Sequence, residues 1–261
     1  MGIPRVRRAS PEERLSVVDH LQELRNRLII CLVAVVVAFA GLYAVRDALL
    51  EFLQAPLPER HRDAGLITLS PTEPFFTTLK VCFWASIIVV IPVWLYQLYA
   101  FVIPAVGAHS RRVTLAIVAG VSALFLGGVA FGYWVVLPVA LDFLLGFGAD
   151  QFQAEVQAGA YYGFATALLL GAGIMFEVPA AMLTMARMGF VTADQFVAQW
   201  RVAVVVIAVI AAILPGGDPF SMLLLMAPQL VLYALGVWLA RRFGRPPLWR
   251  AAEDPEGTAG A

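Results

Sequence analysis

Long apolar segments constrain the fold of this chain more than any other feature of its sequence. Six of them follow one another, at residues 28–45, 79–103, 113–138, 160–185, 202–214 and 221–240. Most approach or exceed the roughly 20 residues that a helix needs to cross the hydrocarbon core of a bilayer, whereas 202–214 is clearly shorter. Hydrophobic residue types make up 61% of the chain, and soluble domains contain roughly 45 to 50%. The sequence therefore predicts an integral membrane protein.

These segments favour helices over strands, because they lack the alternation of apolar and polar residues that a transmembrane barrel shows. We expect an all-α fold, an integral membrane bundle of six transmembrane helices. Segment 202–214 would need a thinned bilayer, flanking residues or support from its neighbours. Residues 1–27 are expected to form a cytoplasmic N-terminal segment with an amphipathic helix, 28–240 the transmembrane domain, and 241–261 a disordered cytoplasmic tail.

The arginines are distributed unevenly between alternate loops. One set of loops and ends contains Arg5, Arg7, Arg8, Arg14, Arg25, Arg27, Arg111, Arg112, Arg187, Arg201, Arg241, Arg242, Arg245 and Arg250. The other set contains only Arg46, Arg60 and Arg62. Because arginine and lysine are enriched in cytoplasmic loops, both termini are expected in the cytoplasm. The formal net charge is zero, so nothing in it indicates a nucleic-acid partner.

The residues of common catalytic and metal sites are not grouped in this sequence. Cys31 and Cys82 both lie in predicted spans, where cysteine acts as a small apolar residue, and they indicate no disulfide or metal framework. His20, His61 and His109 lie in three different segments, and no hydrolase or nucleotide-binding motif is present. We therefore expect no cofactor, no metal and no enzymatic activity, and a membrane-embedded hydrolase lacks its nucleophile and base.

A charged turn, residues 19–27, leads directly into the first apolar segment. His20, Glu23 and Arg27 fall on one helical face. In one interpretation, the arginines mark a cytoplasmic flank and Glu23 pairs with Arg27 at i+4, a contact that contributes only a few tenths of a kcal/mol. In the other, Glu23 is a functional carboxylate at the membrane edge.

Glu177 is an ionisable residue inside the fourth apolar segment, in the sequence Phe176-Glu177-Val178-Pro179. At about 1.5 Å per residue from Ala160, Glu177 lies roughly 25 Å along the helix, past its middle toward the cytoplasm. A carboxylate at this depth predicts a functional site, and Pro179 predicts a kink with a wet pocket. The alternative is a neutral glutamic acid that is hydrogen-bonded to a neighbouring helix.

Smaller features concern the helices themselves. Residues 47–54 are expected to form a short surface helix, ended by Ala55-Pro56-Leu57-Pro58. The third apolar segment is expected to end near Pro138, followed by an acidic outer loop that includes Asp142. Four glycines of this segment are spaced so that another helix backbone could approach closely; they are Gly120, Gly127, Gly128 and Gly132.

Several short motifs together define a family resemblance. They are His20-Leu21-x-Glu23-Leu24-Arg25-x-Arg27, Ala55-Pro56-Leu57, Pro74-Phe75-Phe76-Thr77, Tyr96-Gln97 with Ala100-Phe101-x-x-Pro104, His109-x-Arg111-Arg112, Phe176-Glu177-Val178-Pro179 and a proline-glycine turn with Asp218. Over residues 16–242 the chain resembles the TatC family, the polytopic subunit of the twin-arginine (Sec-independent) protein translocase. The resemblance implies six helices with both ends inside, a concave shape, and the cytoplasmic membrane of a prokaryote.

The resemblance also implies a function. A TatC-like receptor would recognise twin-arginine signal peptides and, with single-span TatA/TatB-type partners, export folded proteins using the proton-motive force, as a possible homo-oligomer. Glu23 would hold a signal arginine in a bidentate pair that lysine cannot reproduce. The implied signal-peptide site comprises His20, Glu23, Arg25, Phe101, Ser110, Arg111 and Arg112. The implied structural or partner-contact residues are Pro56, Pro92, Pro179 and Asp218, with Glu177 as an intramembrane polar site.

The sequence departs from the family pattern at Ser110, where family members commonly have a glutamate before the paired arginines. Either Glu23 alone holds one signal arginine while carbonyls at the end of the second helix bind the other, or Asp19 substitutes for the missing carboxylate.

The alternative function is a proton-coupled small-solute secondary transporter with Glu177 as its coupling site. A translocase subunit should copurify with single-span partners and bind signal peptides, whereas a transporter should move a solute on reconstitution alone.

Overall fold

The structure is a computed structural model that describes residues 17–106, 111–149, 155–213 and 219–244. Within these ranges the chain is helical and contains no named strand, only an isolated bridge between Ile67 and Gln157. The expectation of an all-helical membrane fold is therefore confirmed for the described residues. Five of their helices are long and apolar enough to cross a membrane.

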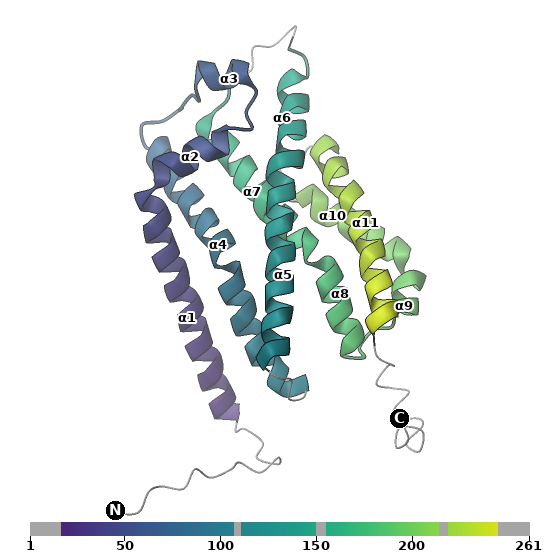
Figure 1. Cartoon of the computed structure of the whole chain (residues 1–261). Coiled ribbons are helices and arrows are strands. Elements are labelled where there is room, and N and C mark those ends of the chain that lie inside the picture. Colours follow the sequence, from purple (N-terminus) through teal and green to yellow (C-terminus); the bar gives the residue numbers. More distant parts are fainter. Residues whose placement is uncertain (1–16, 107–110, 150–154, 214–218, 245–261) are drawn as a thin grey trace, which may run out of the picture.

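The long helices form the body of the molecule (Figure 1). They are α1 (Val17–Ala44), α4 (Glu73–Val106), α5 (Arg111–Phe131) with its continuation α6 (Leu137–Gly146), α7 (Ala158–Phe176) with its continuation α8 (Val178–Arg187), and α11 (Pro219–Phe243). Helix α10 (Trp200–Ile213) has 14 residues and measures about 21 Å, against roughly 30 Å of hydrocarbon. Three short helices complete the part of the chain that the structure describes: α2 (Arg46–Gln54), α3 (Glu59–Ala64) and α9 (Ala193–Ala198).

Helix α7 lies at the centre of the packing, and α1 lies at its edge. Helix α7 packs against α4 and α5, while α1 packs mainly against α4 and α11 packs against α8 and α10. Apolar side chains of α7 and of the α5–α6 helix form the core, among them Leu168, Val136 and Leu137. Most apolar side chains of α1 remain exposed, as expected of a helix that faces lipid.

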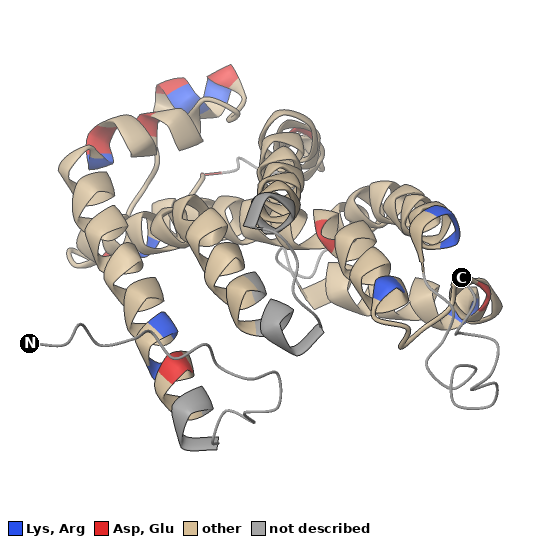
Figure 2. Cartoon of the chain, turned by 60° about the horizontal axis from the view of Figure 1, so that its bottom comes forward, with Lys and Arg blue, Asp and Glu red and all other residues tan. Residues whose placement is uncertain are grey.

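Charged residues gather at the two ends of the molecule. Figure 2 shows Lys, Arg, Asp and Glu on the first turns of α1 and on α2 and α3, with a nearly uncharged middle. Helices α2 and α3 cross the end of the bundle opposite the N-terminal end of α1 (Figure 1). The predicted surface helix at residues 47–54 is confirmed as α2, which ends directly before Ala55-Pro56.

The third apolar segment does not end at Pro138, so that expectation is wrong. The helix continues through a π-helical turn, Gly132–Val136, into α6, where Pro138 is the second residue. Proline cannot donate to the carbonyl four residues earlier, and its ring clashes with that carbonyl in an α-helix. The wider π turn includes this position, Trp134, and lets the helix pass the proline. Asp142 consequently lies in α6 and not in a loop.

Two of the four glycines expected at a close helix contact are found there. A Cβ built on Gly128 would lie 2.6 Å from the carbonyl oxygen of Ala172 on α7, and one on Gly132 would lie 2.9 Å from the Cβ of Ala172. A Cβ on Gly120 or Gly127 would meet nothing within 4 Å. The α5–α7 seam therefore depends on Gly128 and Gly132, because their lack of a side chain lets the backbones approach.

The segment between α8 and α10 contains a short helix that the sequence analysis read as loop. Helix α9 begins with a capping box, in which Thr192 and Gln195 exchange backbone and side-chain hydrogen bonds. The Tyr233 hydroxyl on α11 donates to the Phe196 carbonyl at 2.7 Å. This contact attaches α9 to the last long helix.

Candidate functional site

The structure describes only part of the expected binding site. The side chains that it describes are those of Glu23, Arg25 and Phe101. For three further expected residues the structure describes the helix backbone but not the side chain; they are His20, Arg111 and Arg112. Ser110 of the expected binding site lies outside the described residues altogether, as does Asp218 of the expected structural or partner-contact residues.

An ion pair joins Glu23 and Arg27 on the first turns of α1. Arg27 Nε donates to Glu23 Oε1 at 3.1 Å, and Arg27 Nη2 donates to the same oxygen. The i+4 spacing places the two side chains on one face of the helix. The local pairing anticipated from the sequence is therefore present, and it occupies one oxygen of the carboxylate that the expected site needs.

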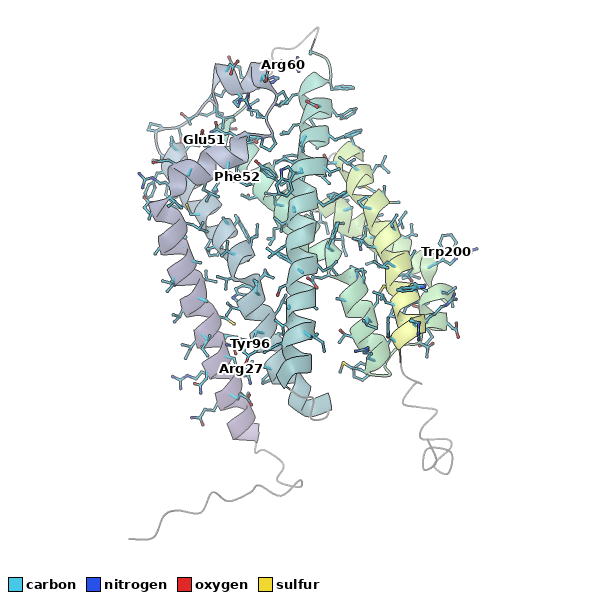
Figure 3. All side chains as sticks on the ribbon, viewed as in Figure 1. Arg27, Glu51, Phe52, Arg60, Tyr96 and Trp200 are labelled. Atoms are coloured by element: carbon cyan, nitrogen blue, oxygen red, sulfur yellow. The ribbon has the colours of Figure 1, made fainter. Side chains whose placement is uncertain are left out.

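Arg27 also reaches across to α4. Its Nη1 donates to Gln97 Oε1 at 3.1 Å, and its Nη2 donates to the Ala100 carbonyl at 3.2 Å. Figure 3 shows Arg27 at the end of α1 that lies beside Tyr96 on α4. The guanidinium thus joins α1 to α4. Its two acceptors on α4 lie 70 and 73 residues after Arg27 in the chain.

The ion pair is only partly withdrawn from solvent. The Glu23 side chain is 38% exposed and the Arg27 side chain 21%. They line a cavity of about 380 Å³ together with Gln22, Asn26, Ile30 and Gln97. Among the described residues, Oε2 of Glu23 has no hydrogen-bond partner. Among the side chains that the structure describes, this cavity is therefore lined by a carboxylate with one oxygen left for a further cation.

Phe101 and Arg25 flank this cavity but do not line it. Phe101 follows Ala100, whose carbonyl accepts from Arg27, and is half-buried near the end of α4. Arg25 is exposed on α1. Gln97 belongs to one of the family motifs. Its hydrogen bond to Arg27 joins two helices, so the sequence alone did not predict it.

Glu177 lies at a break between helices, as its position before Pro179 predicted. Helix α7 ends at Phe176, α8 begins at Val178, and Pro179 is buried. The Glu177 carboxyl faces the backbone of Phe125 on α5, and its Oε1 is buried without a hydrogen-bond partner among the described residues. The Ser122 hydroxyl, one turn before Phe125, is likewise buried without a partner there. Glu177 therefore faces α5 and does not line the Arg27 cavity.

The remaining expected structural residues lie in separate places. Pro56 follows the end of α2, and Pro92 lies inside the continuous helix α4. A group of three His, Cys, Asp or Glu residues that could hold a metal ion was not found among the described residues.

Three tyrosines hold α2 on the core, a contact that the sequence analysis missed. The hydroxyls of Tyr133, Tyr161 and Tyr162 donate to the carbonyls of Phe52, Leu53 and Leu50, at 2.7, 2.6 and 3.3 Å. The carbonyls of Phe52 and Leu53 lie in the last turn of α2 and lack a donor four residues later within the helix, so Tyr133 and Tyr161 act as caps. Tyr162 adds a hydrogen bond one turn earlier, at Leu50. Tyr residues inside an apolar segment were the available signal, because a buried hydroxyl requires a partner.

Glu73 forms a second contact that was missed. Its carboxylate accepts hydrogen bonds from the backbone of Leu69 at 2.7 Å and of Gly159 at 2.9 Å, and from Gln157 Nε2 at 2.8 Å. These bonds connect the N-terminus of α4 to the N-terminus of α7. A carboxylate in the first turn of a helix, here before Pro74, was the available signal.

Comparison with known proteins gives one consistent family. Residues 19–228 match the family model described as Sec-independent protein translocase protein (TatC). The chain is 37% identical over 244 residues to TatC of Halothiobacillus neapolitanus, which covers 93% of this chain and 66% of the relative. It is 34% identical over 225 residues to TatC of Aquifex aeolicus, which covers 85% of this chain and 93% of the relative.

A plant protein and a solved structure extend the comparison. The chloroplastic protein TATC of Arabidopsis thaliana is 36% identical over 243 residues, covering 93% of this chain and 71% of that protein. The chain spans only 65% and 66% of the length of the related rice and pea proteins. A crystal structure of the twin arginine translocase receptor TatC superposes with a TM-score of 0.78 at 33% identity, covering 87% of this chain and all of that one.

Proposed function

Since the chain belongs to the TatC family of Sec-independent protein translocases, we propose that it binds twin-arginine signal peptides as the core receptor subunit of that system. With TatA/TatB-type single-span partners it exports folded proteins, using the proton-motive force. It works as a receptor and conduit without catalytic activity.

The Glu23–Arg27 pair is the observation that carries this proposal. The cavity between α1 and α4 already holds one guanidinium, through a carboxylate, an amide oxygen and a backbone carbonyl. A guanidinium has five donors in a planar fork, and this set of acceptors suits such a fork better than a single ammonium group. A signal arginine that enters the same cavity meets the Glu23 carboxylate, which is the charged member of this set.

The topology of the proposed receptor has six spans with both termini in the cytoplasm. The five long helices supply five of the spans, and α10 supplies the sixth by packing against α11. Arginines at the N-terminal end of α1 and in the last turn of α11 support this orientation. In a prokaryote this membrane is the cytoplasmic membrane.

The second signal arginine requires an acceptor other than Ser110, which has no carboxylate. Carbonyls near the end of α4 are suitable, since the Ala100 carbonyl already accepts from a guanidinium. Glu23 therefore carries more of the recognition in this chain than in relatives with a glutamate at this position.

Binding of a labelled signal peptide to the purified protein in detergent tests the proposal. An Arg-Arg peptide should bind more tightly than its Lys-Lys counterpart, and Glu23→Gln should weaken Arg-Arg binding about 10- to 100-fold, since a hydrogen bond to a charged group contributes about 1.5–3 kcal/mol. Glu51→Gln is the matched control, because it removes an exposed carboxylate from α2 at the other end of the bundle (Figure 3). Arg-Arg binding that is unchanged by Glu23→Gln would contradict the proposed site.

A proton-coupled transporter is the second candidate, because Glu177 has a buried carboxyl oxygen without a partner among the described residues. Against it, the larger cavity of about 610 Å³ is lined by Glu73 and Lys80 and does not include Glu177. Solute uptake by liposomes that contain this protein alone would favour the transporter. Copurification with single-span partners would favour the receptor.

A further inference from the structure

Arg27 occupies the carboxylate that the proposed receptor needs for its ligand. Both of its donors to Glu23 converge on Oε1, although a guanidinium fork ordinarily spans both oxygens of a carboxylate. On the basis of the proposed function, we infer that Arg27 is a built-in competitor for Glu23 and thereby sets the preference of the site for arginine over lysine.

The first step of the argument concerns the charge that an incoming cation meets. With Arg27 in place, Glu23 belongs to a neutral pair that lines the cavity. Attraction between a neutral pair and a distant cation is weak, so affinity depends on the short-range exchange of one cation for another. A ligand gains a full bidentate pair with Glu23 only if Arg27 gives up Oε1.

The second step concerns the fate of the displaced Arg27. Its Nη1 and Nη2 keep the Gln97 amide oxygen and the Ala100 carbonyl as acceptors on α4. The displaced guanidinium is therefore not left as a half-buried charge without partners, which would be costly. Exchange of one guanidinium for another at Glu23 is nearly balanced, and the rest of the signal peptide can drive it.

The third step compares arginine with lysine. An ammonium group cannot form two parallel N–H bonds to one carboxylate, so it replaces the Arg27 pair by a weaker one. The exchange is then unfavourable at Glu23, and the lysine ligand is rejected. Selectivity arises here from an internal group that lysine fails to displace, in addition to better contacts with arginine.

Substitution of Arg27 tests the inference in the binding assay described above. Arg27→Gln should raise the affinity for the Lys-Lys peptide more than for the Arg-Arg peptide, so that the ratio of the two affinities falls about five- to tenfold, the difference between a charge-assisted and a neutral hydrogen bond. Arg27→Lys, which keeps the charge and loses the fork, should lower the same ratio even if Arg27→Gln does not fold.

Two further variants separate competition from other effects. Arg241→Gln removes one charge from an exposed position in the last turn of α11, and should change both affinities by a similar factor and keep the ratio. Gln97→Leu keeps the Glu23–Arg27 pair but removes an acceptor of the displaced guanidinium, and should weaken Arg-Arg binding.

The outcomes distinguish the two proposals. If folded Arg27→Gln and Arg27→Lys proteins bind the Arg-Arg peptide more weakly at an unchanged ratio, Arg27 builds the site with Glu23, and the competitor inference is overturned. If the unsubstituted protein shows no preference between the peptides, the proposed receptor function itself fails.

Discussion

Replacement of Gly128 by alanine tests whether the α5–α7 seam depends on a missing side chain. The new Cβ would lie 2.6 Å from the Ala172 carbonyl oxygen and 2.7 Å from the Phe176 Cβ. These atoms belong to a helix backbone and to a Cβ, so they cannot rotate away, and the helices must separate. Overpacking of this kind costs about 1–3 kcal/mol.

The neighbouring glycine is the matched control. Gly127→Ala places a Cβ where nothing lies within 4 Å, and it gains the same helix propensity, about 0.5–1 kcal/mol. The difference between the two variants therefore isolates the overpacking cost, about 1–3 kcal/mol in favour of Gly127→Ala.

Thermal unfolding in detergent, followed by circular dichroism, measures this difference. At about 2–4 °C per kcal/mol for a chain of this size, Tm of Gly128→Ala should lie about 2–12 °C below that of Gly127→Ala. Equal Tm values would refute the reasoning, because they would show that α5 and α7 are not in backbone contact at Gly128.

Two other substitutions test the roles of single side chains, Tyr161 and Glu177. Tyr161→Phe leaves the buried Leu53 carbonyl without its donor, so unfolding should become easier by about 1–3 kcal/mol, measured by thermal unfolding with Tyr43→Phe on α1 as the control. Glu177→Ala should impair export of a twin-arginine reporter in cells while the purified protein stays folded, because the buried Oε1 forms no hydrogen bond among the described residues and the carboxyl faces only the Phe125 backbone; a protein that no longer folds would instead indicate a structural role.

The apolar segments predicted the helices well, because burial of a helix in lipid is decided by length and hydrophobicity alone. Helix α2 was also predictable, since the prolines that end it act on the adjacent residue. Pro138 misled the prediction for the converse reason. A proline stops a helix only where nothing else accommodates its ring, and the π turn at Gly132–Val136 depends on packing that is not local.

The contacts of the candidate site also differ in whether the sequence could predict them. The Glu23–Arg27 pair lies within one helical turn and follows from spacing, whereas Gln97 and the Ala100 carbonyl reach Arg27 from another helix. Glycine spacing likewise could not separate Gly127 from Gly128, because the sequence does not contain the direction in which α7 lies. Local geometry was therefore predictable, and contacts between helices were not.

The tyrosine caps of α2 have a consequence for the order in which the molecule is made. Each of the three tyrosine hydrogen bonds joins a carbonyl of α2 to a hydroxyl that lies 81 to 112 residues later in the chain. Ribosomes add about 5 to 20 residues per second, so α2 emerges roughly 4 to 22 seconds before its partners. During that interval water must satisfy its last carbonyls, which is possible at the membrane surface and not in hydrocarbon. We therefore expect α2 to stay at the lipid–water boundary until the helices that carry the three tyrosines complete its hydrogen bonds.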